Sequence, residues 1–210
     1  MAYPDNVFIN CPFDADYDPL RRAIVFAVLD CGFTPRCALE ATNGHHYRFE
    51  NIKKIIKESK FGIHDISRTE LDAVNSLPRF NMPLELGVFI GAASFGSRHH
   101  KDKNILILDK EPHRYQKFIS DISGQDIQSH GNCERSVIDR VRTWLSTEAR
   151  KVIPGGTHIA DRYDQFKDEL PALCDSLKLE APKLTFAEHA TIVAAWAAKE
   201  PLGASTAMAN

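Results

Sequence analysis

One carboxylate stands alone in a long apolar stretch of the sequence. Residues 82–95 are almost wholly apolar and small, and Glu85 carries their only charge. We expect a helix here, capped by Asn81, with Glu85 in its first turn and most of its sides buried. A buried charge is unfavourable unless it is paired or put to use. Glu85 is therefore our candidate for an ionised catalytic nucleophile or cation stabiliser; the structural alternative is that it reinforces the cap or pairs with Arg79.

Polar side chains also follow the predicted strands. Ligands of open parallel sheets bind at the carboxyl ends of the strands, so these residues are candidates for substrate binding. Asp65 is expected to orient a sugar through hydrogen bonds, or else to cap the next turn. Arg36 and Arg79 are expected to hold phosphate, or else to form salt bridges with Glu40 and Glu85. The other residues at these positions are Cys11, Asp14, Tyr17, His64, Ser67, Arg68, Asp109 and Arg114.

Two of these loops have a more specific interpretation. Asp14 and Tyr17, after the first strand, could bind a base or a ribose, and the alternative is a turn-forming acidic cluster. Asp109 and Arg114, after the fourth strand, are expected to close their loop structurally.

The sequence contains no strong metal or phosphate motif. Asp121, Asp126 and His130 lie together in residues 120–131 but lack the spacing of a known metal site, so a polar helix–loop junction is the interpretation and no metal is expected. Neither a G-x-G-x-x-G turn nor a Walker P-loop is present, so dinucleotide-dependent redox chemistry and kinase-like chemistry lose their usual phosphate cradle.

Strands and helices alternate at short spacing through the first 150 residues. This alternation predicts a mostly parallel sheet with helices on both faces. Strands are expected at 6–10, 33–39, 60–67 and 103–110, and helices at 17–32, 48–59, 81–95, 112–122 and 134–149. Gly87 and Gly91 in the apolar helix are expected to allow close packing on the sheet.

A break at residues 152–157 separates this α/β domain, residues 1–150, from the rest. Helical patterns at 161–179 and 185–200 predict a helical appendage over 151–200, and a disordered tail is expected at 201–210. The apolar face of residues 191–198 indicates a packing partner, either the domain's own elements or another subunit, and we expect a homo-oligomer.

The composition excludes several classes of partner. The chain has 210 residues, a formal net charge of −2 and a pI near 6.5, so no basic field argues for nucleic acid. It has no apolar run of about 18 residues, so no membrane span is expected. The N-terminus lacks the pattern of a signal peptide, and five cysteines without a CxxC pair indicate reduced thiols in the cytoplasm.

Four segments together resemble a known family. "VFINCPF" (7–13), "HDIS" (64–67), "FNMPLELGVFIGA" (80–92) and "KNILILD" (103–109) look like the nucleoside 2-deoxyribosyltransferase-like group. That group is a flavodoxin-like branch neighbouring the Toll/interleukin-1 receptor (TIR) domains, and the resemblance spans roughly residues 5–110. It implies a flavodoxin-like fold.

The resemblance also implies roles for individual residues. Glu85 takes the place of the family's catalytic glutamate, and Asp65 that of its substrate-binding aspartate. Asn81 opens the Asn-x-x-x-Glu-Leu-Gly motif. Tyr17 and Asp14 lie where the first loop contacts base or sugar. Cys11 and Phe13 belong to the small-Pro-aromatic turn that ends the first strand.

The activity that these relatives share is cleavage of an N-glycosidic bond. The resemblance implies an N-glycosidase, an NAD glycohydrolase-like enzyme or cyclase, or a (deoxy)ribosyltransferase, acting on NAD or on a nucleoside or nucleotide. No cofactor is expected, since NAD would be a substrate. Bacterial relatives that carry additions to the α/β domain, such as a helical appendage, look like antiphage effectors or signal producers. The alternative is a non-catalytic nucleotide-sensing domain or a TIR-type assembly domain.

Overall fold

A computed structural model describes residues 3–40, 47–71 and 76–199 of the chain. The tail expected at 201–210 lies outside these residues.

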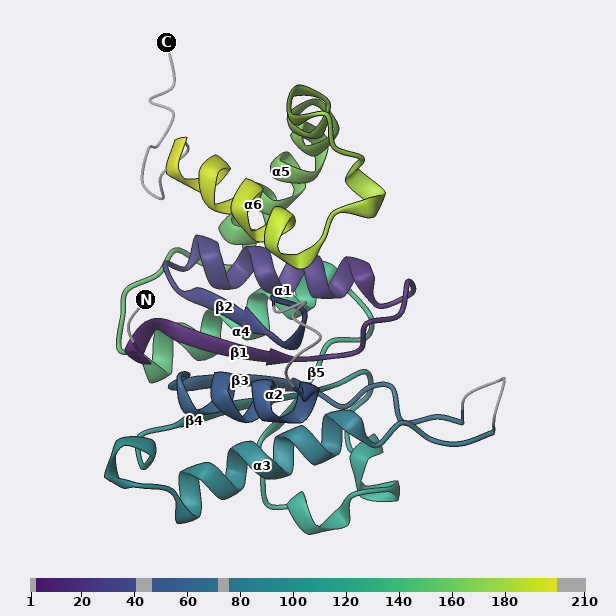
Figure 1. Ribbon diagram of the computed structural model, residues 1–210, viewed down its shortest axis with the longest axis vertical. Coiled ribbons are helices and arrows are strands. Elements are labelled where there is room, and N and C mark those ends of the chain that lie inside the picture. The colour runs from purple at the N-terminus through teal and green to yellow at the C-terminus, as the bar shows by residue number, and fades with distance from the viewer. Residues whose placement is uncertain (1–2, 41–46, 72–75, 200–210) are drawn as a thin grey trace.

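The core of the protein is a parallel β-sheet of five strands (Figure 1). The strands are β1 (Asn6–Asn10), β2 (Thr34–Cys37), β3 (Phe61–Asp65), β4 (Asn104–Asp109) and β5 (Ile127–Ser129). Their order is β2-β1-β3-β4-β5, and every neighbouring pair is parallel. This is the order of the flavodoxin-like doubly wound fold. The predicted fold class, an α/β sheet of this type, is therefore confirmed.

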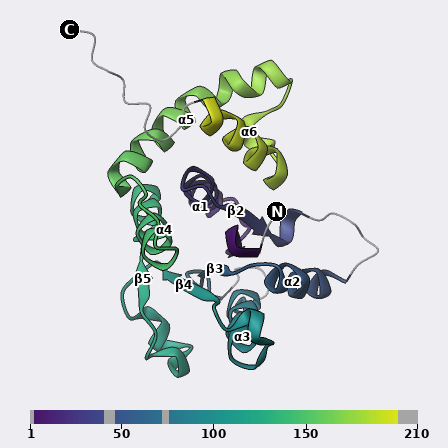
Figure 2. The ribbon, with the colours of Figure 1, turned by 90° about the vertical axis from the view of Figure 1, so that its left-hand side faces the viewer.

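Helices cover both faces of the sheet, as the side view makes plain (Figure 2). The helices next to the sheet are α1 (Asp18–Asp30), α4 (Glu134–Glu148), α2 (Arg48–Lys57) and α3 (Asn81–Phe95). The first two pack on one face and the last two on the other. All five residues of β1 and of β3 are buried, as expected for central strands of a parallel sheet covered on both sides.

Two further helices, α5 (Gly156–Leu177) and α6 (Phe186–Lys199), form an outer layer over α1 and α4. The ring of Phe26 on α1 meets those of Tyr163, Phe166 and Trp196 at centroid distances of 5.2 to 5.7 Å. The predicted helical appendage thus shares one apolar core with the α/β part. The apolar face of residues 191–198 is buried in that core and not left for another subunit.

The sequence interpretation of residues 112–131 was wrong in two places. The helix expected at 112–122 is instead a pair of short 3₁₀ turns, Arg114–Lys117 and Ser120–Ile122, and His113 before them has a left-handed φ of 59°. The expected helix–loop junction contains β5, which pairs with the end of β4. This strand has only three residues, all half-buried, so it leaves no apolar run by which to detect it.

The interpretation of α3 also needs correction. Phe80 precedes the helix, Asn81 is its first residue, and no side chain caps it, so Glu85 lies beyond the first turn. Only one face is buried, whereas Leu84 and Phe95 are exposed. A Cβ atom added at Gly87 or Gly91 would meet nothing within 4 Å, so these glycines do not serve close packing on the sheet.

A different glycine is required by packing. A Cβ atom at Gly62, in the middle of β3, would lie 2.8 Å from His64 Nε2 and 2.8 Å from the ring of Phe89. Both neighbours are fully buried, so neither can move aside easily. We expect Gly62→Ala to lower the free energy of unfolding by about 1–3 kcal/mol in urea denaturation.

The matched control for Gly62→Ala is Gly87→Ala, on the open side of α3. Because alanine is a better helix former than glycine, this variant should be more stable by up to about 1 kcal/mol. Equal stability of Gly62→Ala and the natural protein would contradict the tight packing at β3.

Candidate functional site

The site lies at the carboxyl ends of β1 and β3, where the strand order reverses. The side chain of Asn10, the last residue of β1, fixes the start of α3 at this edge. Its Nδ2 donates a hydrogen bond to the carbonyl oxygen of Met82 (2.8 Å) and lies 3.0 Å from His64 Nδ1. Met82 and Glu85 are one turn apart on the buried face of α3. The strand end therefore sets the position of the Glu85 carboxyl.

Glu85 has an unusual environment for a carboxyl group. It is only 9% exposed, and no described residue forms a hydrogen bond or salt bridge with it. Burial raises the pKa of Glu85 to about 7, and the positive charge of Arg48, at the start of α2, opposes this rise. The carboxyl is therefore divided between its two protonation states near neutral pH. The structural alternative, a salt bridge between Glu85 and Arg79, is not formed among the described residues, and Arg79 contacts Asp14 (3.3 Å) instead.

The neighbouring thiols are not alternative nucleophiles. Burial raises the pKa of Cys11 well above its usual value, and it raises the pKa of Cys37 to about 12. The charge of Glu85 adds to both shifts, so the carboxyl lies near both sulfur atoms. Because a thiol reacts through its thiolate form, Glu85 is the group in this cluster whose charge changes near neutral pH.

Asp65 is at the end of β3, as predicted, but it is fully enclosed. Its Oδ2 accepts a hydrogen bond from the hydroxyl of Tyr17 (2.6 Å) and lies 2.9 Å from His130 Nε2. Its Oδ1 accepts one from the backbone N–H of Ser67 (2.8 Å). The backbone N–H of Asn132 donates to His130 Nδ1 (3.0 Å), so Nε2 is the ring nitrogen that faces Asp65. Asp65, at the end of β3, thus joins the loop before α1 to the loop after β5.

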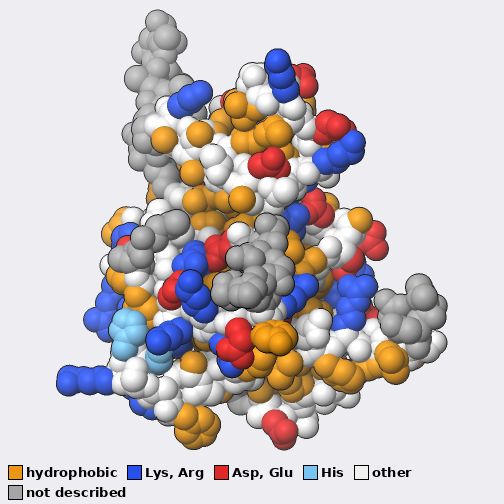
Figure 3. Space-filling model, in the orientation of Figure 1, with side chains coloured by type: hydrophobic (Ala, Val, Ile, Leu, Met, Phe, Trp, Pro, Cys, Tyr) orange, Lys and Arg blue, Asp and Glu red, His pale blue; other side chains and the backbone are white. Residues whose placement is uncertain are grey.

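The first loop lies beside this cluster. The guanidinium of Arg48 is 5.7 Å from the centre of the Phe13 ring, which links the loop to the charge that faces Glu85. Asp14 contacts Arg68 (3.5 Å) and Arg79 (3.3 Å). Arg68 and Arg79 are partly exposed. Together with Arg48 and the ring of Phe13 they surround the first loop, which we call the rim of the site. Over the visible face as a whole, charges of both signs are interspersed (Figure 3).

The remaining predicted residues lie in other contacts. Arg36 binds Glu40 through Nε (2.9 Å) and also contacts Glu58 (3.4 Å), so it forms the salt bridge that was its structural alternative. Asn81 is exposed at the start of α3. Asp109 is buried and accepts a hydrogen bond from Arg114 Nε (2.8 Å), and Arg114 also binds the carbonyl oxygen of Ile66. This pair closes its loop structurally, as expected.

Sequence reasoning missed two residues of the site. Arg48 begins a helix after the second strand, and no local pattern indicates that its charge acts on Glu85. His130 was assigned to a polar helix–loop junction after a metal site had been weighed, whereas its contact is with Asp65. A parallel sheet brings the carboxyl ends of all its strands to one edge, so placing β5 correctly would have brought His130 to Asp65.

Within residues 3–40, 47–71 and 76–199, no group of three or more His, Cys, Asp and Glu side chains is arranged to hold a metal ion. None of the described helices is long and apolar enough to span a membrane. The five cysteines are free thiols.

Comparison of the chain with known protein families, with curated proteins and with solved structures found no match. The class to which the protein can be assigned is thus the one its strand order defines, an α/β protein of the flavodoxin-like type.

Proposed function

We propose that the protein cleaves the N-glycosidic bond of a nucleotide or nucleoside, NAD included, with Glu85 as the catalytic residue. One observation carries the proposal. Glu85 lies at the carboxyl end of the sheet, 9% exposed and without a hydrogen-bond partner among the described residues, and its pKa is raised to about 7. Carboxyl groups in such surroundings are typical of catalytic sites.

The reaction follows from the chemistry of a sugar carbon. As the bond between C1′ and the base nitrogen breaks, its electron pair leaves with the base, and positive charge develops at C1′ and the ring oxygen. The Glu85 carboxylate stabilises this charge or forms an ester bond to C1′. Water, another base or a hydroxyl of the substrate then bonds to C1′ and releases the carboxylate. The products are accordingly those of a hydrolase, a transferase or a cyclase.

The rim of the site suits the rest of such a substrate. Phe13 offers a ring face to a base, and Arg48 offers positive charge to phosphate; Arg79 could do so only in competition with its contact to Asp14. Arg36, already bound by Glu40 and Glu58, is less suited to this role. Asp65, enclosed by Tyr17 and His130, would act by holding the first loop in place unless that cluster opens.

The enclosure of Asp65 is the observation that favours the alternative, a nucleotide-sensing or TIR-type assembly domain without turnover. Both candidates suit a cytoplasmic protein with reduced thiols, and a bacterial antiviral role belongs to the same proposal. The expected homo-oligomer stays a prediction, and the face at 191–198 no longer supports it, since that face is buried within the chain.

A panel of substrates tests the function. The full chain is incubated with NAD and with the common nucleosides, deoxynucleosides and nucleotides, and the release of nicotinamide or base is followed by chromatography. Release from at least one substrate is expected, and the sugar product separates hydrolysis from transfer and cyclisation. Binding measured by calorimetry without release of any base would favour the sensing alternative.

The pH dependence of turnover should report the ionisation of the Glu85 carboxyl. Only the ionised carboxylate can attack or stabilise C1′, so the rate at saturating substrate should rise between about pH 6 and 8. Arg48 holds this pKa down, so Arg48→Met should move the rise to higher pH. The measurement is the rate of base release from pH 5 to 9.

Lys53→Met is the matched control for Arg48→Met, because Lys53 lies on the same helix but pairs with Glu50. Its profile should coincide with that of the natural protein. A profile that is unchanged in Arg48→Met would contradict the electrostatic link between Arg48 and Glu85.

A further inference from the structure

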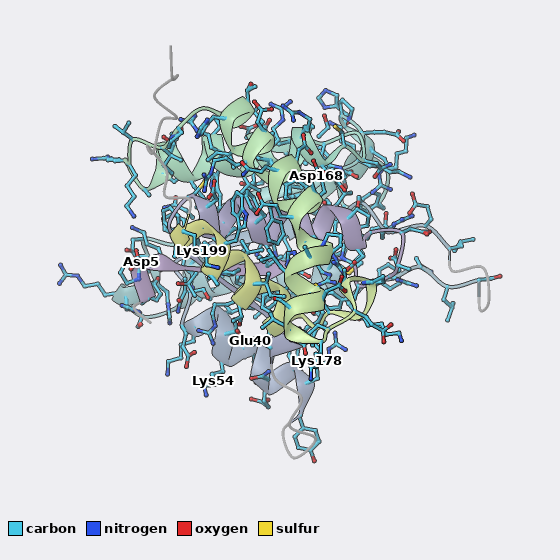
Figure 4. The ribbon with its side chains drawn as sticks, turned by 90° about the horizontal axis from the view of Figure 1, so that it is seen from above. Asp5, Glu40, Lys54, Asp168, Lys178 and Lys199 are labelled. Carbon is cyan, nitrogen blue, oxygen red and sulfur yellow. The ribbon has the colours of Figure 1, made fainter. Side chains whose placement is uncertain are left out.

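A cavity of about 790 Å³ lies between the start of α1 and the outer helices α5 and α6, away from Glu85. Figure 4, seen from above, shows the outer layer that covers this part of the molecule: α5 passes Asp168 and ends just before Lys178, and α6 ends at Lys199. The residues of the cavity that bear on its chemistry are Phe13, Arg21, Arg22, Tyr163, Lys183 and His189. The volume is in the range of sites for small molecules.

The wall of this cavity contains a histidine without a partner. His189, on α6, is 2% exposed, and neither of its ring nitrogens is hydrogen-bonded to any described residue. Burial, followed by the charges of Arg22 and Arg21, lowers the pKa of His189 to about 3. The ring is therefore neutral and presents one donor and one acceptor. Buried polar groups in proteins are nearly always hydrogen-bonded, so the ring lacks the partner that such a group normally has. A ligand that supplied it would displace the side chains that now cover both nitrogens.

The cavity also carries an excess of positive charge. Arg21 and Arg22 both bind the same carboxylate, Asp18. Two guanidinium groups over one carboxylate leave donors and one positive charge for an anion. Lys183 is largely exposed at the rim, where its ammonium group also pairs with Glu180 (2.7 Å).

The other acidic residues of the cavity are already bound by cations. Asp14 is bound by Arg68 and Arg79, and Glu134 by Lys167. They therefore do not cancel the positive charge at Arg21 and Arg22.

Aromatic side chains complete the lining. Phe13 is partly exposed, whereas Tyr163 and Phe166, on α5, are buried beneath the surface of the cavity. The ring of Phe166 is 5.9 Å from that of His189, in an edge-to-face arrangement. The exposed ring of Phe13 beside cationic groups suits a planar molecule that carries an anionic group.

We propose that this cavity is a second ligand site, which takes a small aromatic anion of the nucleoside monophosphate type through His189, Arg21 and Arg22. The site does not depend on the chemistry of Glu85. Phe13 lines the cavity and also faces Arg48, so a ligand here would touch the same loop that borders Glu85. A ligand bound in this cavity would thereby alter the surroundings of Glu85.

The test is isothermal titration calorimetry on the full chain carrying Glu85→Gln, so that no ligand is consumed. The probes are AMP, GMP, CMP and UMP, with the matching nucleosides and inorganic phosphate as separate arms. We expect saturable binding of at least one monophosphate, with a dissociation constant below about 1 mM. The proposal does not require the nucleosides or inorganic phosphate to bind by themselves. Addition of His189→Leu should weaken it at least tenfold, whereas His158→Leu, an exposed histidine on α5, should leave it unchanged.

Two further variants keep the test decisive. Lys183→Gln alters an exposed side chain, so the fold should be unaffected even if His189→Leu fails to fold, and it should weaken binding about threefold. Arg48→Met reports binding at the Glu85 site instead. Binding that falls with Arg48→Met but not with His189→Leu or Lys183→Gln would overturn the proposal, as would no saturable binding of any monophosphate.

Discussion

Replacement of Glu85 by glutamine is expected to abolish base release and at the same time to stabilise the folded protein. Glutamine keeps the size and shape of the side chain but can neither form an ester with C1′ nor balance the positive charge of the transition state. Loss of such a group lowers turnover by about a thousandfold or more. The measurement is the rate of base release at saturating substrate, using the best substrate of the panel.

The gain in stability follows from the sign of the pKa shift. The pKa of Glu85 is raised from 4.5 to about 7 in the folded chain, so folding favours the protonated form. As the pH rises from 4.5 to 7, ionisation makes the natural protein progressively less stable, and above pH 7 this loss is constant. Glutamine does not ionise. At pH 8 Glu85→Gln should therefore be more stable by about 1–3 kcal/mol, and near pH 4.5 the difference should vanish.

Glu111→Gln is the control for Glu85→Gln, because Glu111 is an exposed glutamate in a loop. It should change neither turnover nor the difference in stability between the two pH values. Full turnover by Glu85→Gln would remove the central residue of the proposed function. A loss of stability at pH 8 would mean that the carboxylate holds the structure together rather than serving chemistry.

Removal of the Arg162 side chain should cause the largest loss of stability. The carboxylate of Asp30 is 1% exposed and accepts hydrogen bonds from Arg162 Nη2 (2.7 Å) and Nε (2.9 Å). Asp30 is also the last residue of α1, where the helix dipole disfavours negative charge. Arg162→Met would leave this charge buried without a partner. We expect a loss of about 3–5 kcal/mol in urea denaturation.

Two controls define the cause of that loss. Arg135→Met breaks another arginine–aspartate contact of α5, with Asp161 and Asp164, but at an exposed site, so its effect should be small. The double variant Asp30→Asn/Arg162→Met carries no buried charge and should regain a substantial part of the stability. Equal losses in the single and double variants would show that packing of Arg162, and not the stranded carboxylate, is responsible.

The fold could largely be predicted because its central strands are continuous apolar runs. Residues of β1 and β4 read as buried strands, and the alternation with helices gives the parallel sheet. β5 could not be found in this way, because its three residues are half-buried and its place is set by pairing with β4. The 3₁₀ turns after β4 were not predicted for a similar reason: the left-handed backbone of His113 depends on the conformation of the loop and not on a periodic sequence pattern.

The site was predictable to the extent that a single residue departs from its surroundings. Glu85 was singled out because it is charged in an apolar segment, and the structure brings it to the strand ends. The contacts that define its environment are long-range. Asn10 holds Met82 across 72 positions in the sequence, and Tyr17 reaches Asp65 across 48, so neither distance can be read from local spacing.

The position of α1 between the sheet and the outer helices has a consequence for how the chain is made. Apolar side chains of α1, Phe26 among them, are covered on the outer side by residues that the ribosome adds more than a hundred positions later. Until Trp196 has emerged, this surface stays open to water and to other chains. The newborn protein should therefore engage chaperones through α1, and early termination before α5 should yield aggregates rather than a smaller working domain.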